Sequence, residues 1–191
     1  MIELRDVSFN YNGGDECISN IDLCIEDNEC VVLMGCSGNG KTTLTRLING
    51  LAPSYYPGKL TGEITINGKL VDNMPQWKRA RHIGSIFQDP KSQFFSSELR
   101  GEIAFACENY GMITDIVCAR TDAAISDMKL SHLIETPIDR LSNGEKQKTA
   151  IASVYVLNPE TYVFDEPSAN LDDEATEHLA QIMKQLKKLL I

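Results

Sequence analysis

The stretch GCSGNGKT, Gly35 to Thr42, combines three glycines with a lysine and a threonine in the pattern G-x-x-x-x-G-K-[ST]. Phosphate oxygens need several N–H donors close together, and glycines let the backbone curl into such a nest without Cβ clashes. Apolar residues precede the stretch and a helical pattern follows it, so the N-terminus of a helix would face the bound anion. The alternative is a glycine-rich turn that binds nothing, and the strand–loop–helix context argues against it. The sequence therefore predicts a P-loop for nucleotide phosphates.

Each side chain of this loop has a predicted task. Lys41 is expected to reach the β- and γ-phosphates, and the Thr42 hydroxyl is expected to ligate Mg²⁺. The predicted ATP-binding residues of the loop are Gly35, Cys36, Ser37, Gly38, Asn39, Gly40, Lys41, Thr42 and Thr43.

Two adjacent carboxylates end a second apolar stretch, TYVFDEP at 161–167. Asp165 is expected to hold Mg²⁺ through a water, and Glu166 to act as general base on the water that attacks the γ-phosphate. The alternative is an acidic strand end that only adds solubility. Together with a P-loop, the pair predicts ATP hydrolysis with Lys41 and Glu166 as catalytic residues.

Composition limits the partners. The 191 residues are 42% hydrophobic and 24% charged with a formal net charge of −9, which is ordinary for a globular protein and argues against binding nucleic acid. No apolar run reaches the roughly 20 residues of a membrane span, and the N-terminus does not resemble a signal peptide. Any membrane association is therefore expected to come through a partner.

Strands and helices alternate along the chain. Period-two patterns predict strands over 2–11 and 17–25, and a hairpin over 61–71 that turns at Asn67-Gly68. Fully apolar patterns predict a strand at 30–35 that is buried on both faces, and further strands at 82–88 and 161–167. Helices are expected over 41–51, 96–112, 114–135, 142–157 and 172–190. The alternation predicts an α/β protein with a parallel sheet and a mostly helical segment from about 90 to 140.

Four motifs in order, GCSGNGKTT, FQDP, LSNGEKQ and VFDEPSANLD, resemble those of the ATP-binding cassette (ABC) ATPases. The resemblance covers essentially the whole chain. It implies a P-loop NTPase core with an antiparallel β subdomain and an inserted α-helical subdomain. The chain is then a single domain over 1–191, with a nucleotide-binding core at 1–89 and 141–191 and a helical subdomain at 90–140. It also implies that two cassettes pair head to tail around two ATP molecules.

The resemblance also implies residue roles. Tyr11 matches the aromatic residue that stacks on adenine, although an ordinary strand-end tyrosine is an equal alternative. Gln88 matches the glutamine that contacts Mg²⁺ and the attacking water, which makes Thr42, Gln88 and Asp165 the metal set. The signature residues expected to cap the opposite subunit's ATP are Ser142, Asn143, Gly144 and Glu145. Asp172 matches an aspartate of the dimer interface.

The chain departs from the family pattern in three places. Asn143 replaces a glycine, and Glu145 replaces a glutamine, which would place a negative charge near the partner's nucleotide. The family carries a switch histidine on a strand that comes after the 161–167 segment and its following helix, and its absence here puts hydrolysis in doubt. His82, His132 and His178 are interpreted as structural or surface residues. The resemblance further implies that the closing strands are missing and that the chain is truncated.

The segment GSIFQDPKSQFFSSELRGEIAFACENYGM resembles the ATPase subunits of energy-coupling factor transporters, which import cobalt and vitamins. In that branch this region contacts a transmembrane partner, so Phe94 and Phe95 are candidates for an exposed docking surface, unless they pack inside the helical part. The expected partners are a second cassette, identical or not, and a transmembrane subunit that holds the protein at the inner face of the cell membrane.

Two other functions stay open. A soluble ABC ATPase of DNA repair would need a long coiled-coil insertion between the P-loop and the signature, and no heptad run is present there. A regulatory cassette that binds ATP with little turnover would fit Asn143, Glu145 and the missing histidine.

Overall fold

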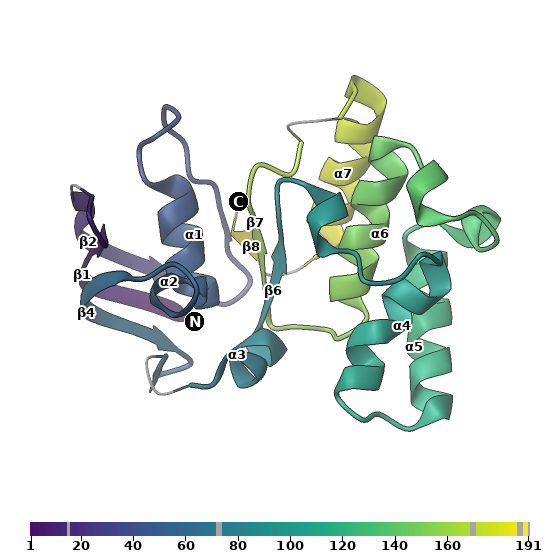
Figure 1. Cartoon of the computed structure of the whole chain (residues 1–191), viewed down its shortest axis with the longest axis horizontal. Coiled ribbons are helices and arrows are strands. Elements are labelled where there is room, and N and C mark those ends of the chain that lie inside the picture. Colours follow the sequence, from purple (N-terminus) through teal and green to yellow (C-terminus); the bar gives the residue numbers. More distant parts are fainter. Residues whose placement is uncertain (15, 72–73, 169–170, 187–188, 191) are drawn as a thin grey trace. The chain divides into compact units, whose positions relative to one another are not determined.

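The computed structural model describes residues 1–14, 16–71, 74–168, 171–186 and 189–190 (Figure 1). The chain divides into two compact units, each described by itself. The first comprises Met1–Gly84, Glu160–Asp165 and Lys187–Ile191, and the second comprises Ser85–Pro159 and Glu166–Leu186. The predicted division into a core at 1–89 and 141–191 and a helical subdomain at 90–140 stays a prediction.

An antiparallel sheet in the first unit has the strand order β2-β1-β4-β5. Its strands are β1 (Ile2–Tyr11), β2 (Glu16–Ile25), β4 (Gly58–Ile66) and β5 (Lys69–Leu70). Between β4 and β5, Asn67 (φ 51°) and Gly68 (φ 73°) both have left-handed backbones, as a two-residue type I′ hairpin turn requires. The predicted hairpin is therefore present.

A second sheet has the order β3-β8-β7-β6, from β3 (Cys30–Val31), β8 (Leu189–Leu190), β7 (Thr161–Phe164) and β6 (Ile83–Ile86). The pairs β3–β8 and β7–β8 are parallel, as the alternation of elements predicted.

The strand predicted at 30–35 is only partly present, and its burial on both faces was wrong. Val31 and Leu33 pack on the core, whereas Val32 and Met34 are 55% and 88% exposed. Alternation explains the difference, because successive residues of an extended chain face opposite ways. Within the described residues, β3 lies at an edge of this sheet and pairs with β8.

The described part of the first unit contains the helices α1 (Lys41–Asn49), α2 (Leu51–Ser54) and α3 (Gln76–His82). Helix α1 buries Leu44, Leu47 and Ile48 in the hydrophobic core that also holds the inner face of β1. At its C-terminal end, Arg79 donates to the carbonyls of Leu47 and Val71. Such donors satisfy carbonyls that the last turn of a helix leaves free, and so α3 fixes α1 and the loop before it.

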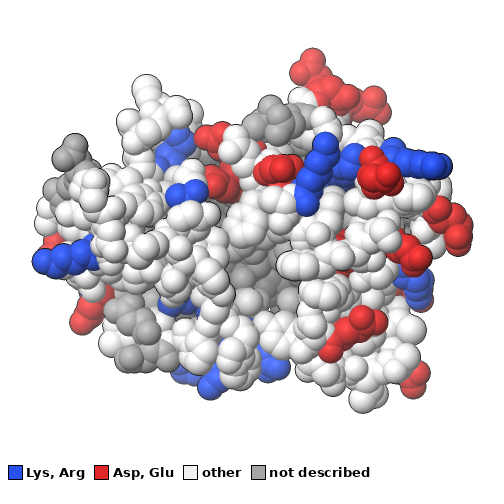
Figure 2. Space-filling model, in the orientation of Figure 1, with Lys and Arg blue, Asp and Glu red and all other residues white. Residues whose placement is uncertain are grey.

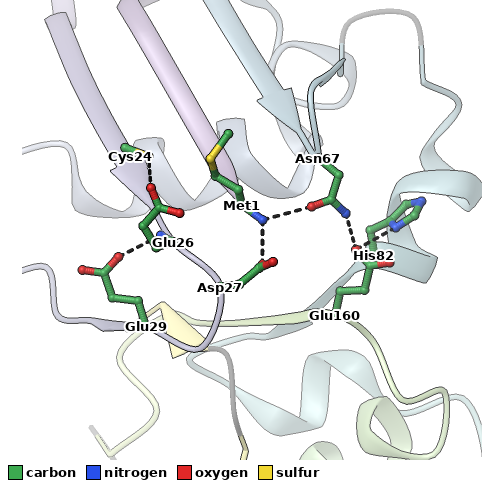
Figure 3. A network of polar contacts seen from close by, with 8 residues as sticks. All are labelled: Met1, Cys24, Glu26, Asp27, Glu29, Asn67, His82 and Glu160. Atoms are coloured by element: carbon green, nitrogen blue, oxygen red, sulfur yellow. Dashed lines mark hydrogen bonds and ion pairs between the residues drawn. The ribbon is translucent and has the colours of Figure 1, made fainter.

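A polar network joins five segments of the first unit near the start of β1 (Figure 3). The amine of Met1 donates to Asp27 Oδ1 (2.8 Å) and Asn67 Oδ1 (2.9 Å), and Asn67 Nδ2 donates to Glu160 Oε2 (2.6 Å). His82 Nδ1 lies 3.1 Å from Glu160 Oε2 without hydrogen-bond alignment, so the contact is an ion pair only when His82 is protonated. This network supports a structural interpretation of His82.

The second unit is helical. Its elements are the 3₁₀ turns Pro90–Gln93, Ser131–Leu133 and Ile138–Arg140 and the helices α4 (Leu99–Asn109), α5 (Thr114–Asp127), α6 (Asn143–Tyr155) and α7 (Asp173–Gln185). The helix predicted over 114–135 ends at Asp127, and Lys129 has a left-handed backbone (φ 56°) that a helix cannot continue through. Acidic side chains gather over α7 in Figure 2, in keeping with the negative net charge.

The helix predicted over 172–190 is also too long. Helix α7 ends at Gln185, Leu186 is extended (ψ 113°), and Leu189–Leu190 form β8. Residues 187–188 lie outside the described chain, as do Ala169 and Asn170 of the VFDEPSANLD motif. Parallel pairing with β3 and β7 uses the backbone groups of residues 189–190, which is a non-local effect that helical periodicity does not report. Among the described residues, no helix has the length and apolar character needed to cross a bilayer.

Candidate functional site

The predicted phosphate loop lies in the first unit, where Gly35–Gly40 lead into α1 at Lys41. Gly40 caps the helix with a left-handed backbone (φ 80°), and a Cβ there would lie 2.5 Å from Ile18 Cγ2. Only glycine satisfies both the backbone angle and the close approach of β2. The loop positions Ser37, Gly38 and Asn39 come directly before this cap and are closed by a backbone hydrogen bond from Asn39 to Cys36 (3.3 Å).

The Lys41 side chain folds back across this loop. Its Nζ donates to the carbonyls of Gly35 (2.8 Å) and Cys36 (3.0 Å). An ammonium group has three donors that turn freely, so these contacts hold a positive charge over the loop and leave it able to reach a phosphate. Lys41 is half-buried, and its predicted contact with the β- and γ-phosphates stays a prediction.

Thr42 and Asp165 meet although they are far apart in sequence. The Thr42 hydroxyl donates to Asp165 Oδ1 at 3.1 Å, linking the first turn of α1 to the end of β7. A hydroxyl and a carboxylate are hard oxygen donors of the kind that Mg²⁺ takes, with nucleotide oxygens and waters completing the set. No cluster of three or more His, Cys, Asp or Glu that could hold a metal by themselves occurs in the described chain. Thr42 and Asp165 thus suit a metal that arrives with its nucleotide.

Tyr11 lies at the end of β1 and turns its hydroxyl toward α1. The hydroxyl oxygen is 3.1 Å from Thr43 Oγ1 and accepts a 3.1 Å hydrogen bond from Arg46. Its ring packs edge-on against Phe9, with centroids 4.9 Å apart. Tyr11 is therefore held against α1, and its stacking on adenine stays a prediction.

Gln88 and Glu166 meet in the second unit. Gln88 Nε2 donates to Glu166 Oε2 at 3.0 Å, and both side chains are exposed. Glu166 has φ 47°, a left-handed backbone that glutamate adopts at a cost of about 1–3 kcal/mol and that is concentrated at functional sites. Glu166 follows Asp165 directly in the sequence.

The four signature residues begin helix α6. Ser142 is the N-cap: its hydroxyl accepts from Glu145 N (3.3 Å), and its own N–H donates to Glu145 Oε2 (2.7 Å). The Ser142 N–H lowers the pKa of the Glu145 carboxyl from its ordinary value, and the charges of His132 and Lys148 lower it further. The Glu145 carboxylate thus closes the cap of its own helix, and its predicted place near a partner's nucleotide stays a prediction.

A hollow of about 490 Å³ surrounds this helix start. It brings Ser142 and Gly144 together with Asp172, the predicted interface aspartate, which caps α7 by accepting from Ala175 N (2.8 Å). Lys148 and His178 also line it, and neither is among the residues predicted for the site. Helical spacing was the available signal, because Lys148 stands one turn after Glu145 on the same face.

The two phenylalanines that were predicted to form a docking surface differ in solvent exposure. Phe95 is 76% exposed and stacks on Phe105 with centroids 4.9 Å apart, whereas Phe94 is half-buried. One of the two is thus available on the surface, as one of the alternatives allowed.

Comparison with known proteins agrees with this geometry. The profile of the ABC transporter family matches residues 18–169. Two ABC transporter ATP-binding proteins of Treponema denticola are each 42% identical over 188 residues, which cover 98% of this chain and 38% of theirs. The energy-coupling factor transporter ATP-binding protein EcfA1 of Oceanobacillus iheyensis is 32% identical over 188 residues, which cover 98% of this chain and 66% of EcfA1. The chain spans less than two fifths of the length of the Treponema relatives.

Two solved structures share the fold over the whole chain. The structure of cbiO1 from Clostridium perfringens, described as part of the ABC transporter complex cbiONQ, has a TM-score of 0.86 at 30% identity and is 76% covered. The ATP-binding cassette MJ0796, a dimer in a post-hydrolysis state with ADP and Pi, has a TM-score of 0.84 at 24% identity and is 86% covered. The predicted P-loop α/β fold, with its antiparallel and helical parts, is confirmed. By its ordered motifs, its fold and the match over residues 18–169, the chain belongs to the ABC transporter family.

Proposed function

We propose that the chain binds and hydrolyses ATP to power import through an energy-coupling factor type transporter. The observation that carries the ATP chemistry is the arrangement at the N-terminus of α1, where Lys41 Nζ donates to the loop carbonyl of Gly35 and the Thr42 hydroxyl donates to Asp165. These groups supply a positive charge for phosphates, a hydroxyl for Mg²⁺ and a carboxylate to orient the metal's water shell. Bound Mg²⁺ would neutralise charge on the transferred phosphoryl group, and Thr42 and Asp165 would hold it, with Gln88 as the predicted third ligand.

The remaining catalytic roles fall to Glu166 and Gln88. Glu166 is proposed as the general base, because it is an exposed carboxylate directly after Asp165. Gln88, which donates to that carboxylate, would keep it aimed at the attacking water. Tyr11 is proposed to stack on the adenine, and the loop residues from Gly35 to Thr43 to surround the phosphates.

The proposed partners are a second cassette and a transmembrane subunit. In the head-to-tail pair, Ser142, Asn143 and Gly144 would cap the other subunit's ATP with a hydroxyl and free N–H groups. The Ser142 hydroxyl accepts from Glu145 N, and its own proton would then be donated to a phosphate oxygen of that ATP. Phe95 would dock on the transmembrane subunit, placing the protein at the inner face of the membrane. The 32% sequence identity with EcfA1 favours the energy-coupling factor branch.

Substitution of the proposed base tests the catalytic part. Glu166→Gln in the full-length protein should lower ATP turnover by about 10²–10⁴-fold, because general bases contribute in that range, while leaving ATP binding intact. Turnover would be measured as phosphate release and binding by calorimetry. A variant that hydrolyses ATP at the wild-type rate would disprove the role of Glu166.

Co-purification tests the transport part. The native-length protein, solubilised from its own cells in detergent, should bring with it a multi-spanning membrane protein and a second cassette. Recovery of soluble partners alone would reject the transport role and leave the ATP chemistry standing.

A further inference from the structure

Arg46 is a cation beside the phosphate loop with an unusual set of contacts. It lies in the last turn of α1, and no carboxylate comes within ion-pair distance of it in the described chain. Its contacts there are the hydroxyl of Tyr11 and the ring of Tyr56. An arginine that is held by two aromatic residues, in a protein with net charge −9, calls for an explanation beyond ion pairing.

One side of Arg46 fixes the far end of the Tyr11 ring. The guanidinium donates to the Tyr11 hydroxyl at 3.1 Å, and that hydroxyl also lies 3.1 Å from Thr43 Oγ1. Thr43 is tied in turn to Cys17 Sγ at 3.0 Å. The Tyr11 ring is therefore held at its oxygen by two groups of α1, while Phe9 packs against it edge-on.

The other side of Arg46 is held by Tyr56. The guanidinium carbon lies 4.0 Å from the centroid of the Tyr56 ring, a cation–π distance that suits the planar group. Tyr56 itself follows α2, and its N–H donates to Leu51 O at 3.0 Å. Arg46 thus joins the ring of Tyr11 to a second aromatic residue whose backbone is anchored to Leu51 at the start of α2.

We propose that Arg46 is a positioning residue that fixes Tyr11 for stacking on the nucleobase. The proposal rests on the proposed function, in which Tyr11 contacts adenine. A tyrosine at a strand end that is free to change rotamer loses that freedom on binding, whereas a ring already held in place does not. Arg46 would therefore raise affinity through the base and leave the phosphates to Lys41, which lies roughly 7.5 Å away along the helix axis at 1.5 Å per residue.

Comparing two ligands distinguishes the contribution of the base to binding from that of the phosphates. MgATP has both, whereas Mg-tripolyphosphate has phosphates but no base. In the full-length protein, Arg46→Met should weaken MgATP binding about fivefold to tenfold and leave tripolyphosphate binding within about twofold. Arg46→Lys, which keeps a charge but loses the fork of donors and the planar stack, should fall between. Binding would be measured by calorimetry.

Tyr56 supplies matched controls. Tyr56→Phe keeps the ring and should bind MgATP as the wild type does, whereas Tyr56→Leu should repeat part of the Arg46→Met loss. Equal losses of MgATP and tripolyphosphate in Arg46→Met would overturn the proposal, because Arg46 would then act on the phosphates or on the loop itself. Unchanged MgATP binding would overturn it as well.

The variant Lys41→Ala distinguishes a failure of the Arg46 proposal from a failure of the proposed ATP-binding function. It should weaken both ligands, since Lys41 serves the phosphates. If wild-type protein bound neither ligand, or if Lys41→Ala had no effect, the ATP-binding function would fail whatever Arg46 does.

Discussion

At the scale of single residues, Glu145 has a structural task at the start of the signature helix. Glu145 occupies the position where a glutamine was expected, and it closes a capping box with Ser142. Glutamate and glutamine both serve at this position, because only a side-chain oxygen is needed to accept the N-cap N–H. The pattern S-x-x-E was visible in Ser142–Glu145 and was interpreted only through family resemblance.

Two substitutions of Glu145 should distinguish the contribution of its capping hydrogen bond to stability from the contribution of its charge. Glu145→Ala should lower the free energy of unfolding at pH 7 by about 1 kcal/mol, the usual contribution of a cap, whereas Glu145→Gln should retain most of it. Chemical denaturation measures both. Equal stability of the alanine variant and the wild type would mean that the capping box contributes nothing.

The same carboxylate has a pH dependence of known sign. The pKa of Glu145 is lowered in the folded state, so its contribution is complete above the unfolded value near 4.3 and is lost as pH falls through the folded value. The wild type should therefore lose more stability than Glu145→Gln between pH 5 and about pH 3. Denaturation curves at several pH values check this, and parallel profiles for the two proteins would contradict it.

The Thr42–Asp165 contact predicts a metal-specific defect. Thr42→Val keeps the shape of the side chain but removes the hydroxyl, so the affinity for ATP in the presence of Mg²⁺ should fall about 10- to 100-fold. Binding of ATP in EDTA should change little. Thr42→Ser keeps the hydroxyl and is the matched control. A loss of the same size with and without Mg²⁺ would remove Thr42 from the metal set.

At the scale of elements, the helix start of the phosphate loop depends on the approach of β2. Gly38 and Gly40 both have positive φ, so alanine at either position costs about 1–2 kcal/mol of backbone strain. A Cβ at Gly40 would in addition lie 2.5 Å from Ile18 Cγ2 and 3.1 Å from Cys17 O, whereas a Cβ at Gly38 meets nothing within 4 Å.

Gly40→Ala should therefore destabilise the protein more than Gly38→Ala, by at least about 1 kcal/mol. Urea denaturation without nucleotide measures the difference and keeps ligand binding out of the comparison. If the two variants were equally stable, the close packing of β2 on the start of α1 would make no contribution to the free energy of unfolding.

Local chemistry explains which elements were predictable. The phosphate loop, the Asn67-Gly68 turn and the carboxylates after β7 follow from backbone and charge requirements of a few neighbouring residues. Helix α3 was missed because its buried residue is Arg79, which a hydrophobic pattern counts as exposed. The burial at β3 and the end of α7 depended on strand pairing with residues distant in sequence, which periodicity does not report.

The pairings at the site show the same limit. The sequence indicated Lys41, Thr42 and Asp165 by motif, but the hydrogen bond between Thr42 and Asp165 joins residues that only folding brings together. The contacts of Arg46 with Tyr11 and Tyr56 had no sequence signal, because an arginine in a helix is ordinarily a solvated side chain.

At the scale of the whole molecule, function depends on what the surface offers to other chains. Large apolar side chains that remain exposed mark interaction sites when they lie together, and single ones are ordinary. Phe95 is exposed and stacks on Phe105, so its ring is held in place, which lowers the entropy lost when a partner covers it.

Phe95→Ser should therefore reduce recovery of a multi-spanning partner several-fold in detergent co-purification, while the melting temperature and ATP binding of the isolated protein stay near wild type. Ile113, 65% exposed in the same unit, provides the comparison, and Ile113→Ser should leave recovery unchanged. A fall in both variants would indicate a general effect of surface polarity on the complex. Full recovery with Phe95→Ser would contradict the prediction that the segment after Gln88 docks on the transmembrane subunit.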